Sequence, residues 1–309
     1  MYNEELKKDY LNNGIGSKNV VDFCAVANAA ANMEAEFGRD LAYFTREEVI
    51  QLINGLELTN PLTVKGYLSA IRNYQMVCSD NTELADNPIR KEEIDIVSGI
   101  RKCFYASYHD LVCAMEKVTS LTDGYPEPAA LTLAWLGLSI LEALELKSEN
   151  VDLMNGVIAR YPQRDIVFGS DESEALKVLR TYANTSKSYR TRNCTYEVYK
   201  QENNPYFLHT MVSKSSIDKP GKPIGRNNLT GGYSKMSQKA KELGFDFGFA
   251  YSDILRSGEL YRLYVAEQNG LAVTSKINEE RVCSMISGKM PYYELMYQYK
   301  KYKQAFNLH

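Results

Sequence analysis

A polar, irregular segment at residues 78–101 divides a sequence that otherwise shows mostly helical patterns. Within this segment Asn87 precedes Pro88, and a residue before proline is disfavoured in the helical region. The 309 residues leave enough chain on each side to bury a separate core. We therefore predict three parts: a helical domain at 1–88, a linker at 89–102 and a second domain at 103–309.

The first domain carries the signals of a small helical bundle. Thr45 and Glu48 match the capping box that opens a helix. Asn60-Pro61 supplies an N-cap followed by proline at the first helical position. From there apolar residues recur with the helical period, at Val64, Leu68, Ile71 and Tyr74 or Gln75. The other face of this helix carries Lys65, Ser69 and Arg72, which is typical either of a DNA contact or of an ordinary solvated surface.

The second domain is predicted to combine helices with a small antiparallel sheet, so the fold class is mainly α (α+β). Helical patterns cover residues 103–118, 128–146 with a break at Gly137, 170–183 and most of the last seventy residues. Three short strand-like pieces lie near 151–153, 157–161 and 165–168. Asn155-Gly156 lies between the first two pieces and is a strong hairpin signal.

Two further segments of the second domain are basic. Residues 184–204 are rich in Tyr and Ser and too polar for a core, so we expect a loop or arm there. Residues 227–243 are predicted to form an amphipathic helix that ends at Gly244. Its apolar stripe consists of Leu229, Tyr233, Met236, Ala240 and Leu243.

Charge is distributed unevenly along the chain. Residues 176–241 hold 13 basic and three acidic side chains, whereas the remainder holds 23 basic and 36 acidic ones. A solvated surface would explain any single basic run. A net charge of +10 over 66 residues instead favours a polyanionic partner, and nucleic acid is the first candidate.

Several classes of function find no support in the sequence. The six cysteines form no CxxC pair and we expect no histidine near them, so neither a zinc site, another metal site nor a dense disulfide framework is predicted. The three histidines are isolated, no glycine-rich phosphate loop follows a strand, and no cofactor is expected. The N-terminus MYNEELKKDY lacks an apolar signal-peptide core, and the longest apolar stretch is too short to span a bilayer. We expect a cytoplasmic protein without a membrane partner.

Six segments in order along the chain resemble the tyrosine recombinase (phage integrase) family. They are TVKGYLSAIRNY, LGLSILEALELKSENVDLMNGVI, NPYFLHT, GKPIGRNNLTGGYSKMSQKAKELG, YSDILRSGELYRLYVAEQNG and VCSMISGKMPYYELMY. The resemblance implies a SAM-like helical core-binding domain, followed by a recombinase-like domain with a small antiparallel sheet. It covers nearly the whole chain.

The resemblance also marks the positions at which the family carries its catalytic groups. Transfer of a phosphodiester onto a tyrosine needs cations on the phosphoryl oxygens and an acid for the leaving oxygen. Ser139 stands at the first arginine position, although Glu142 fits the same motif. The sheet turn lacks the family lysine, and Arg164 is the only cation we expect near it.

The last two motifs keep only part of their pattern. Asp253 replaces a histidine and Gly288 stands at another histidine position, while Arg256 and the nucleophile position Tyr297 remain. Removal of one charged donor costs on the order of 10²- to 10³-fold in rate, by analogy with oxyanion donors. We therefore expect vestigial positions at Ser139, Asp253, Arg256, Gly288 and Tyr297, and a protein that is not an enzyme.

Without cleavage, the resemblance implies a sequence-specific duplex-DNA-binding protein, similar to the SPbeta-type phage master repressors. We expect a transcriptional repressor of phage or mobile-element genes that supports lysogeny as a prophage product in a bacterial host. Its partners would be double-stranded DNA and either a second copy or a regulatory protein or peptide. Candidate DNA-binding residues are Lys65, Ser69, Arg72, Lys187, Arg190, Arg192, Arg226, Lys235, Lys239 and Arg256. Base readout could come from Ser69, Asn227, Asn228 or Gln238.

Alternatives remain open at this stage. The chain could be an active site-specific recombinase that uses Tyr297, or a protein-interaction module that has lost DNA binding. Arg256 could instead form a buried ion pair with Glu142 or Asp253. Tyr297 belongs to a Tyr-rich tail that could pack on its own core or on a neighbouring protomer.

Overall fold

The computed structural model describes residues 3–13, 20–160, 165–168, 172–185, 187–192, 194–199, 204–208, 212–213, 223–286 and 290–309. Within these ranges, side chains are described everywhere except at 13, 187–192, 194–199 and 212–213. The chain divides into two compact units. The first unit comprises Met1–Arg101 and Met290–His309, and the second comprises Lys102–Lys289.

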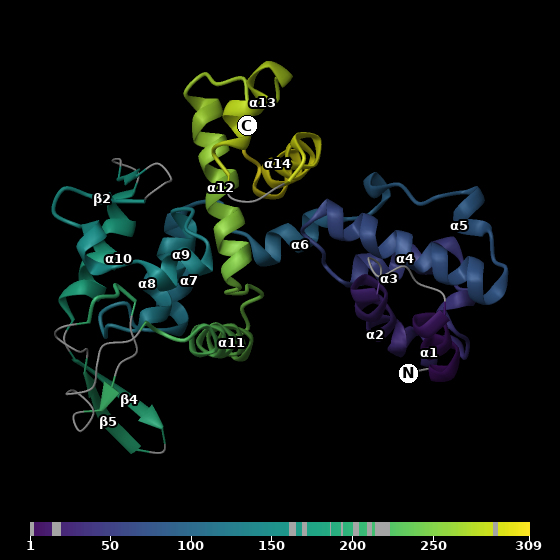
Figure 1. Ribbon diagram of the computed structural model, residues 1–309, viewed down its shortest axis with the longest axis horizontal. Helices are drawn as coiled ribbons and strands as arrows, with labels where there is room; N and C mark the ends of the chain where they lie inside the picture. Colours follow the sequence, from purple (N-terminus) through teal and green to yellow (C-terminus); the bar gives the residue numbers. More distant parts are fainter. Residues whose placement is uncertain are drawn as a thin grey trace. The chain divides into compact units, whose positions relative to one another are not determined.

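The described part of the first unit is entirely helical (Figure 1). Its elements are α1 (Glu4–Asn13), α2 (Val20–Phe37), η1 (Leu41–Tyr43), α3 (Arg46–Gly55), α4 (Pro61–Ser79), α5 (Glu83–Asp86), η2 (Lys91–Glu93), α6 (Ile96–Cys103) and α14 (Tyr292–Phe306). The predicted caps are confirmed: Thr45 and Glu48 form a capping box, and the Asn60 side chain accepts from the N–H of Leu62.

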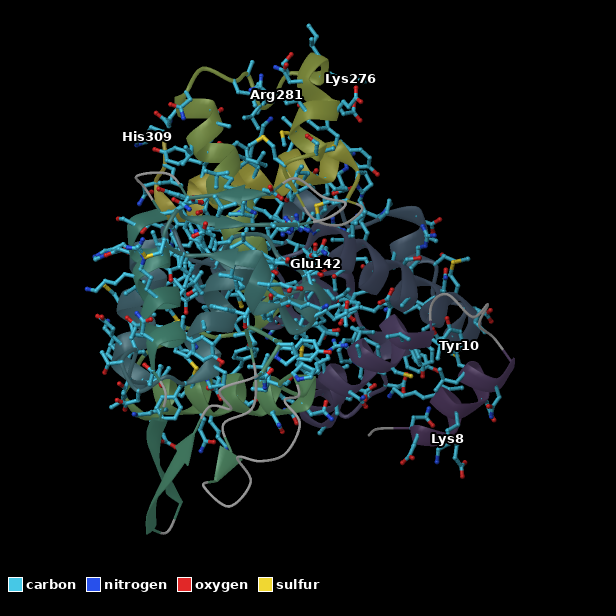
Figure 2. The ribbon with its side chains drawn as sticks, turned by 60° about the vertical axis from the view of Figure 1, so that its left-hand side comes forward. Lys8, Tyr10, Glu142, Lys276, Arg281 and His309 are labelled. Atoms are coloured by element: carbon cyan, nitrogen blue, oxygen red, sulfur yellow. The ribbon has the colours of Figure 1, made fainter. Side chains whose placement is uncertain are left out.

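Helix α4 is the centre of the first unit, since α1, α2, η1 and α14 all pack on it. Its apolar stripe is buried as predicted, except that Leu68 is only half-buried and faces a surface hollow. Tyr74 of α4 meets Tyr10 of α1 (labelled in Figure 2) and Phe23 of α2 in an aromatic cluster. Beside the cluster, buried Lys7 pairs with Glu34 and with Asp40, which also accepts from the Tyr74 hydroxyl.

The second unit surrounds helix α8 (Pro126–Trp135), which is buried except at Glu127, with α7 (Tyr108–Val118), α10 (Ser173–Asn184), α11 (Arg226–Glu242) and α12 (Tyr251–Gln268). Helix α9 (Ile140–Glu145) and η3 (Ser148–Asn150) follow α8, and η6 (Lys276–Asn278) and α13 (Glu279–Cys283) follow α12. Helices α12 and α8 cross at Gly258, where a Cβ would overlap the carbonyl oxygen of Trp135. The sequence break at Gly137 separates α8 from α9, because this glycine has φ +95°.

The predicted small sheet is present and antiparallel in the order β1-β2-β3. Its strands are β1 (Val151–Asp152), β2 (Val157–Ile158) and β3 (Ile166–Val167). Val151 pairs with Ile158, which in turn pairs with Ile166, so Asn155-Gly156 lies in the first hairpin. The fold is therefore mainly helical with a small antiparallel sheet, as predicted.

Two strands of a second antiparallel sheet lie within residues 184–204, where we expected a loop or arm. Strands β4 (Lys187–Arg192) and β5 (Cys194–Tyr199) form a hairpin, and β6 (Val212–Ser213) pairs with β5. The polarity of this stretch indicated that it is not core. Polarity does not exclude strand, because a hairpin satisfies its backbone groups without burying its side chains.

The unit limits differ from the expected domain limits in two places. Residues of the expected linker 89–102 form η2 and most of α6, and up to Arg101 they belong to the first unit. Residues 290–309, which we expected in the second domain, also belong to the first unit because α14 packs on α4. Within the described residues, none of the helices has the length and hydropathy needed to cross a lipid bilayer.

Candidate nucleic-acid interface

The second unit has an open groove of about 790 Å³ between one face of α11, the start of α9 and the start of α12. The α11 side chains in it follow each other at helical spacing: Arg226, Thr230, Tyr233, Ser234, Ser237, Gln238 and Lys241. Ser139, Ile140 and residues 249–252 form the other wall, together with Leu255. Hydroxyl and amide groups thus lie in the groove beside apolar side chains, with Arg226 and Lys241 as cations among its lining residues.

The groove face of α11 is exposed because the opposite stripe anchors the helix. Leu229, Tyr233, Met236 and Ala240 are buried as predicted, whereas Leu243 is 51% exposed, which corrects the predicted stripe. Leu243 is the C-cap residue, so it lies past the last turn that faces the core. The N–H of Phe249 donates to Ser237 Oγ at 3.1 Å and holds the segment before α12 against α11.

The start of α12 adds backbone donors to the groove. Its N-cap residue is Ala250, which has no side-chain oxygen to accept from the first N–H groups of the helix. Helix N-termini of this kind attract anions. Tyr233, which also lines the groove, is only 5% exposed. Its hydroxyl group has no hydrogen-bond partner within the described part of the chain. The groove therefore offers unused donors to an anionic ligand.

Ser139, at the expected first arginine position, is the N-cap residue of α9. Its Oγ accepts from the N–H of Glu142 at 3.3 Å, and Glu142 Oε2 accepts from the N–H of Ser139 at 2.7 Å. Arg160, two residues after β2, donates to Glu142 Oε1 at 2.5 Å (Glu142 is labelled in Figure 2). Burial pushes the pKa of Glu142 up, but the hydrogen bonds from Arg160 and Ser139 more than offset it, and the pKa lies below its usual value.

Arg160 corrects the expectation that Arg164 is the only cation near the sheet turn. Its place near the end of the strand-like piece 157–161 could have identified it from the sequence. Arg164 itself lies outside the described residues, as does Gly288.

Helix α12 carries Asp253 and Arg256. Burial raises the pKa of Asp253 to about 6, with a smaller opposing effect of the Ser252 side chain. Arg256 Nη1 lies 2.8 Å from Glu259 Oε2, one turn along the helix, and Glu259 is 1% exposed. These atoms are close but not aligned for a hydrogen bond. The ion-pair partner of Arg256 is therefore Glu259, not Glu142 or Asp253.

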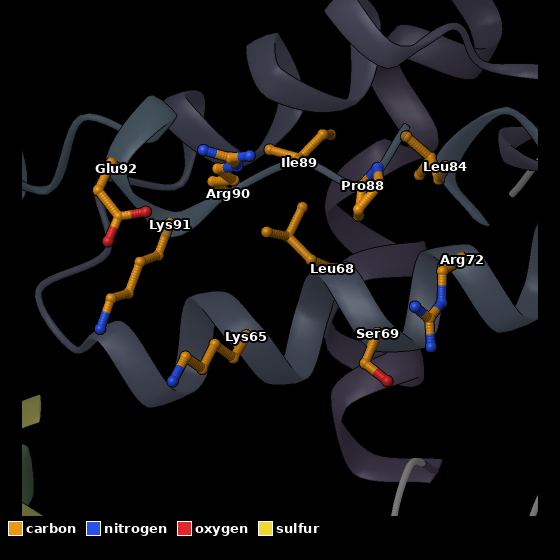
Figure 3. A pocket seen from close by; sticks show the side chains of 10 residues that line it. All are labelled: Lys65, Leu68, Ser69, Arg72, Leu84, Pro88, Ile89, Arg90, Lys91 and Glu92. Carbon is orange, nitrogen blue, oxygen red and sulfur yellow. The ribbon is translucent and has the colours of Figure 1, made fainter. Parts of the chain in front are cut away.

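The first unit brings Lys65, Ser69 and Arg72 together in a hollow of about 370 Å³ (Figure 3). In Figure 3, Leu68 points from α4 toward Ile89 and Pro88 on the facing segment, which makes the middle of the hollow apolar. Lys91 joins Lys65 at one end of it. Sequence reasoning missed Lys91 because it assigned this segment to a linker.

Helix α14 neutralises part of this cationic end. Glu294 is fully buried and pairs with Lys65 and, at 3.0 Å, with Lys91. Both ammonium groups also lie near the Tyr293 ring, at 5.1 and 5.6 Å from its centroid. Burial by itself would raise the pKa of Glu294. The hydrogen bonds from Lys65 and Lys91 lower it by more, so that the pKa lies below its usual value.

Tyr297 belongs to the same helix and therefore to the first unit. Its hydroxyl donates to the carbonyl oxygen of Lys91 at 3.1 Å, and its ring centroid lies 4.5 Å from Lys91 Nζ. Burial, together with the charges of Glu92 and Glu294, raises its pKa. The phenol is thus a half-buried, hydrogen-bonded group whose pKa lies above its usual value.

The remaining expected DNA contacts stay predictions. Lys235 and Lys239 are exposed on α11 but do not line the groove. Lys187, Arg190 and Arg192 lie on β4, where side chains are outside the described part of the structure.

The expectation that no histidine lies near a cysteine is wrong. Cys113 Sγ and His109 Nε2 are 3.5 Å apart on α7. Their spacing of four residues within a predicted helix was the available signal.

Comparison with known proteins gives a partial match. The family described as "MrpR, N-terminal core-binding domain" matches residues 1–78. Among solved structures, "Crystal structure of XerA recombinase" aligns over 98% of this chain and 96% of that chain, with 13% sequence identity and a TM-score of 0.41. A search of curated proteins finds no match. The first 78 residues are therefore similar to a core-binding domain.

Proposed function

We propose that this chain is a sequence-specific duplex-DNA-binding protein of the tyrosine recombinase type, which has lost strand cleavage and represses phage or mobile-element genes. The core-binding match at residues 1–78 and the six family-like segments support the type. The basic stretch at 176–241 supports a polyanionic partner.

The observation that carries DNA binding is the groove beside α11. Arg226 and Lys241 provide charge, and the uncapped start of α12 and the Tyr233 hydroxyl provide donors without partners among the described residues. Phosphate contacts of this kind supply affinity and register, while exposed hydroxyl and amide groups such as Gln238 supply base readout. In the first unit, Arg72 and Ser69 form a second contact surface.

The proposal that cleavage is lost has three supports. Ser139 is a helix N-cap, and the Arg256 guanidinium is paired with Glu259. The Tyr297 hydroxyl donates to the carbonyl oxygen of Lys91. Asp253 is an additional obstacle, because above its pKa it places a negative charge where the family has a histidine. Each lost phosphate donor costs about 10²- to 10³-fold, so the combination leaves no useful rate.

DNA binding is tested with fragments from the promoters of the element that encodes the chain. Lys241→Glu should weaken binding at least about tenfold and reduce the salt slope by about one, because one phosphate contact is lost. Lys276→Glu is the matched control, since Lys276 is an exposed lysine of the second unit outside the groove. Equal binding by wild type and Lys241→Glu would place the interface elsewhere. A promoter reporter tests repression.

A competing proposal is an active site-specific recombinase, which the retained Arg256 and Tyr297 favour. A nicked suicide substrate separates the two. The repressor proposal expects no covalent complex, in wild type or in Tyr297→Phe. A complex formed by wild type and lost in Tyr297→Phe would establish the recombinase instead.

A further inference from the structure

The hollow of the first unit has an apolar middle that the proposed DNA contact does not use. Leu68 on α4 points toward Ile89 and Pro88 (Figure 3), and the buried Leu84 belongs to the same lining. A DNA phosphate does not gain from such a surface, because an anion placed against it loses water without a new partner. The apolar middle instead suits a ligand that has an apolar group of its own.

Cations lie at both ends of this apolar middle. Lys65 and Lys91 share one carboxylate, that of Glu294, so their end keeps a net positive charge. At the other end Arg72 is exposed, and within the described part of the chain it forms neither an ion pair nor a hydrogen bond. Of the charged lining residues four are basic and one, Glu92, is acidic. The ligand should therefore carry a negative charge at each end.

The spacing of the two ends fits an extended peptide. Lys65 and Arg72 are seven positions apart on α4, which corresponds to about 10 Å along the helix axis. In an extended chain, the side chains at positions 1, 3 and 5 point to the same face, and positions 1 and 5 are about 13 Å apart. Because lysine and arginine side chains are long, carboxylates at positions 1 and 5 reach both ends while the third side chain meets the apolar middle. A ligand with one carboxylate, such as a fatty acid, would leave one end unpaired.

We propose that the hollow binds a short acidic peptide segment in which an apolar residue lies between two Asp or Glu residues. One carboxylate pairs with Lys65 and Lys91, and the other accepts two N–H groups of the Arg72 guanidinium. The apolar side chain packs on Leu68 and Ile89, which are half-buried and lose their remaining contact with water when the peptide binds. The inference goes beyond the proposed function and does not depend on it.

The probe is the acetylated peptide Glu-Ser-Leu-Ser-Glu with an uncharged dye at its C-terminal end. Fluorescence anisotropy follows its binding to the full-length protein. We expect saturable binding of one peptide per chain. Replacing the central Leu of the peptide by Ser should weaken binding about tenfold, because the apolar contact is lost. Replacing both Glu residues by Lys should abolish binding, because like charges then face each other at both ends.

Variants of the protein test the same contacts from the other side. Arg72→Glu and Leu68→Ser should each weaken peptide binding at least about tenfold. Lys8→Glu and Val77→Ser are the matched controls, since these residues are an exposed lysine and an exposed apolar residue of the same unit outside the hollow. Both controls should leave binding unchanged. Thermal unfolding verifies that each variant is folded, and the peptide variants test the proposal without any change to the protein.

Three results would overturn the proposal. They are the absence of binding to the acidic peptide, equal binding of the basic peptide, and binding that neither Arg72→Glu nor Leu68→Ser weakens. A short DNA duplex is the alternative occupant: Arg72-dependent binding of the duplex by a protein that does not bind the peptide would assign the hollow to DNA alone. The peptide assay contains no DNA, so its failure and the failure of the proposed function are separate results.

Discussion

At the scale of single residues, burial and charge conflict at Asp253. The carboxyl group lies in the first turn of α12, and desolvation raises its pKa to about 6 from an ordinary value near 3.8. A folded-state pKa above the unfolded one means that the folded protein binds the proton more tightly. The native state is therefore penalised as pH rises from about 4 to above 6.

Asp253→Asn removes this penalty. The variant should be more stable than wild type by about 1–3 kcal/mol at pH 8, because it places no charge in the partly buried site. The difference should vanish below about pH 3, where Asp253 is protonated in both states. Urea unfolding across this pH range measures it. Asp123→Asn, at an exposed position, is the control. A stability difference between wild type and Asp253→Asn that does not vary with pH would contradict the explanation.

At the scale of elements, α14 is held to the first unit by polar contacts as well as by apolar packing. Tyr299, Tyr302 and Leu295 are fully buried, and Gln298 Nε2 donates to the carbonyl oxygen of Thr59 at 2.6 Å. Glu294 adds the ion pairs with Lys65 and Lys91. The helix that carries Tyr297 is thus a structural part of this unit.

Glu294→Gln should loosen α14. The change leaves two lysine ammonium groups facing a neutral amide. Loss of one partner of a buried ion pair lowers the free energy of unfolding, here by about 1–3 kcal/mol because Lys65 is partly exposed. Hydrogen exchange of the α14 amides should speed up accordingly. Glu93→Gln, which breaks a surface pair with Arg46, should leave α14 protection unchanged. Unchanged exchange in Glu294→Gln would show that apolar packing alone holds the helix.

At the scale of the whole molecule, cationic surfaces occur in both units. The hollow in the first unit contains Arg72, and the groove in the second contains Arg226 and Lys241. If both contact one duplex, each unit raises the effective concentration of DNA for the other. Binding should then depend on both surfaces and fall steeply with salt.

Arg72→Glu and Lys241→Glu test this joint use. Each should weaken promoter binding at least about tenfold, and the double variant should show the sum of the two free-energy losses, because sites that share no partners contribute independently. Binding measured at several salt concentrations should show a smaller slope in each variant. Normal affinity of Arg72→Glu would mean that the first unit does not contact DNA through this hollow.

Local rules account for the parts of the fold that could be predicted. The start of α4 at Asn60-Pro61 and the buried stripe of α11 follow from capping and from the 3.6-residue period, and Asn155-Gly156 marks the first hairpin. Each signal involves residues a few positions apart. The hairpin at β4 and β5 was missed because its side chains are polar, although its backbone pairs fully.

By itself, the sequence determined which segments are helical, where many of them begin, and that basic charge gathers in one stretch. Only the tertiary structure decided the long-range partners: Glu294 for Lys65, 229 positions away, and the Lys91 carbonyl for Tyr297. Helix and turn formation depend on neighbours along the chain. The pairing of charges depends instead on which distant surfaces are brought together, and a periodic pattern holds no information on that.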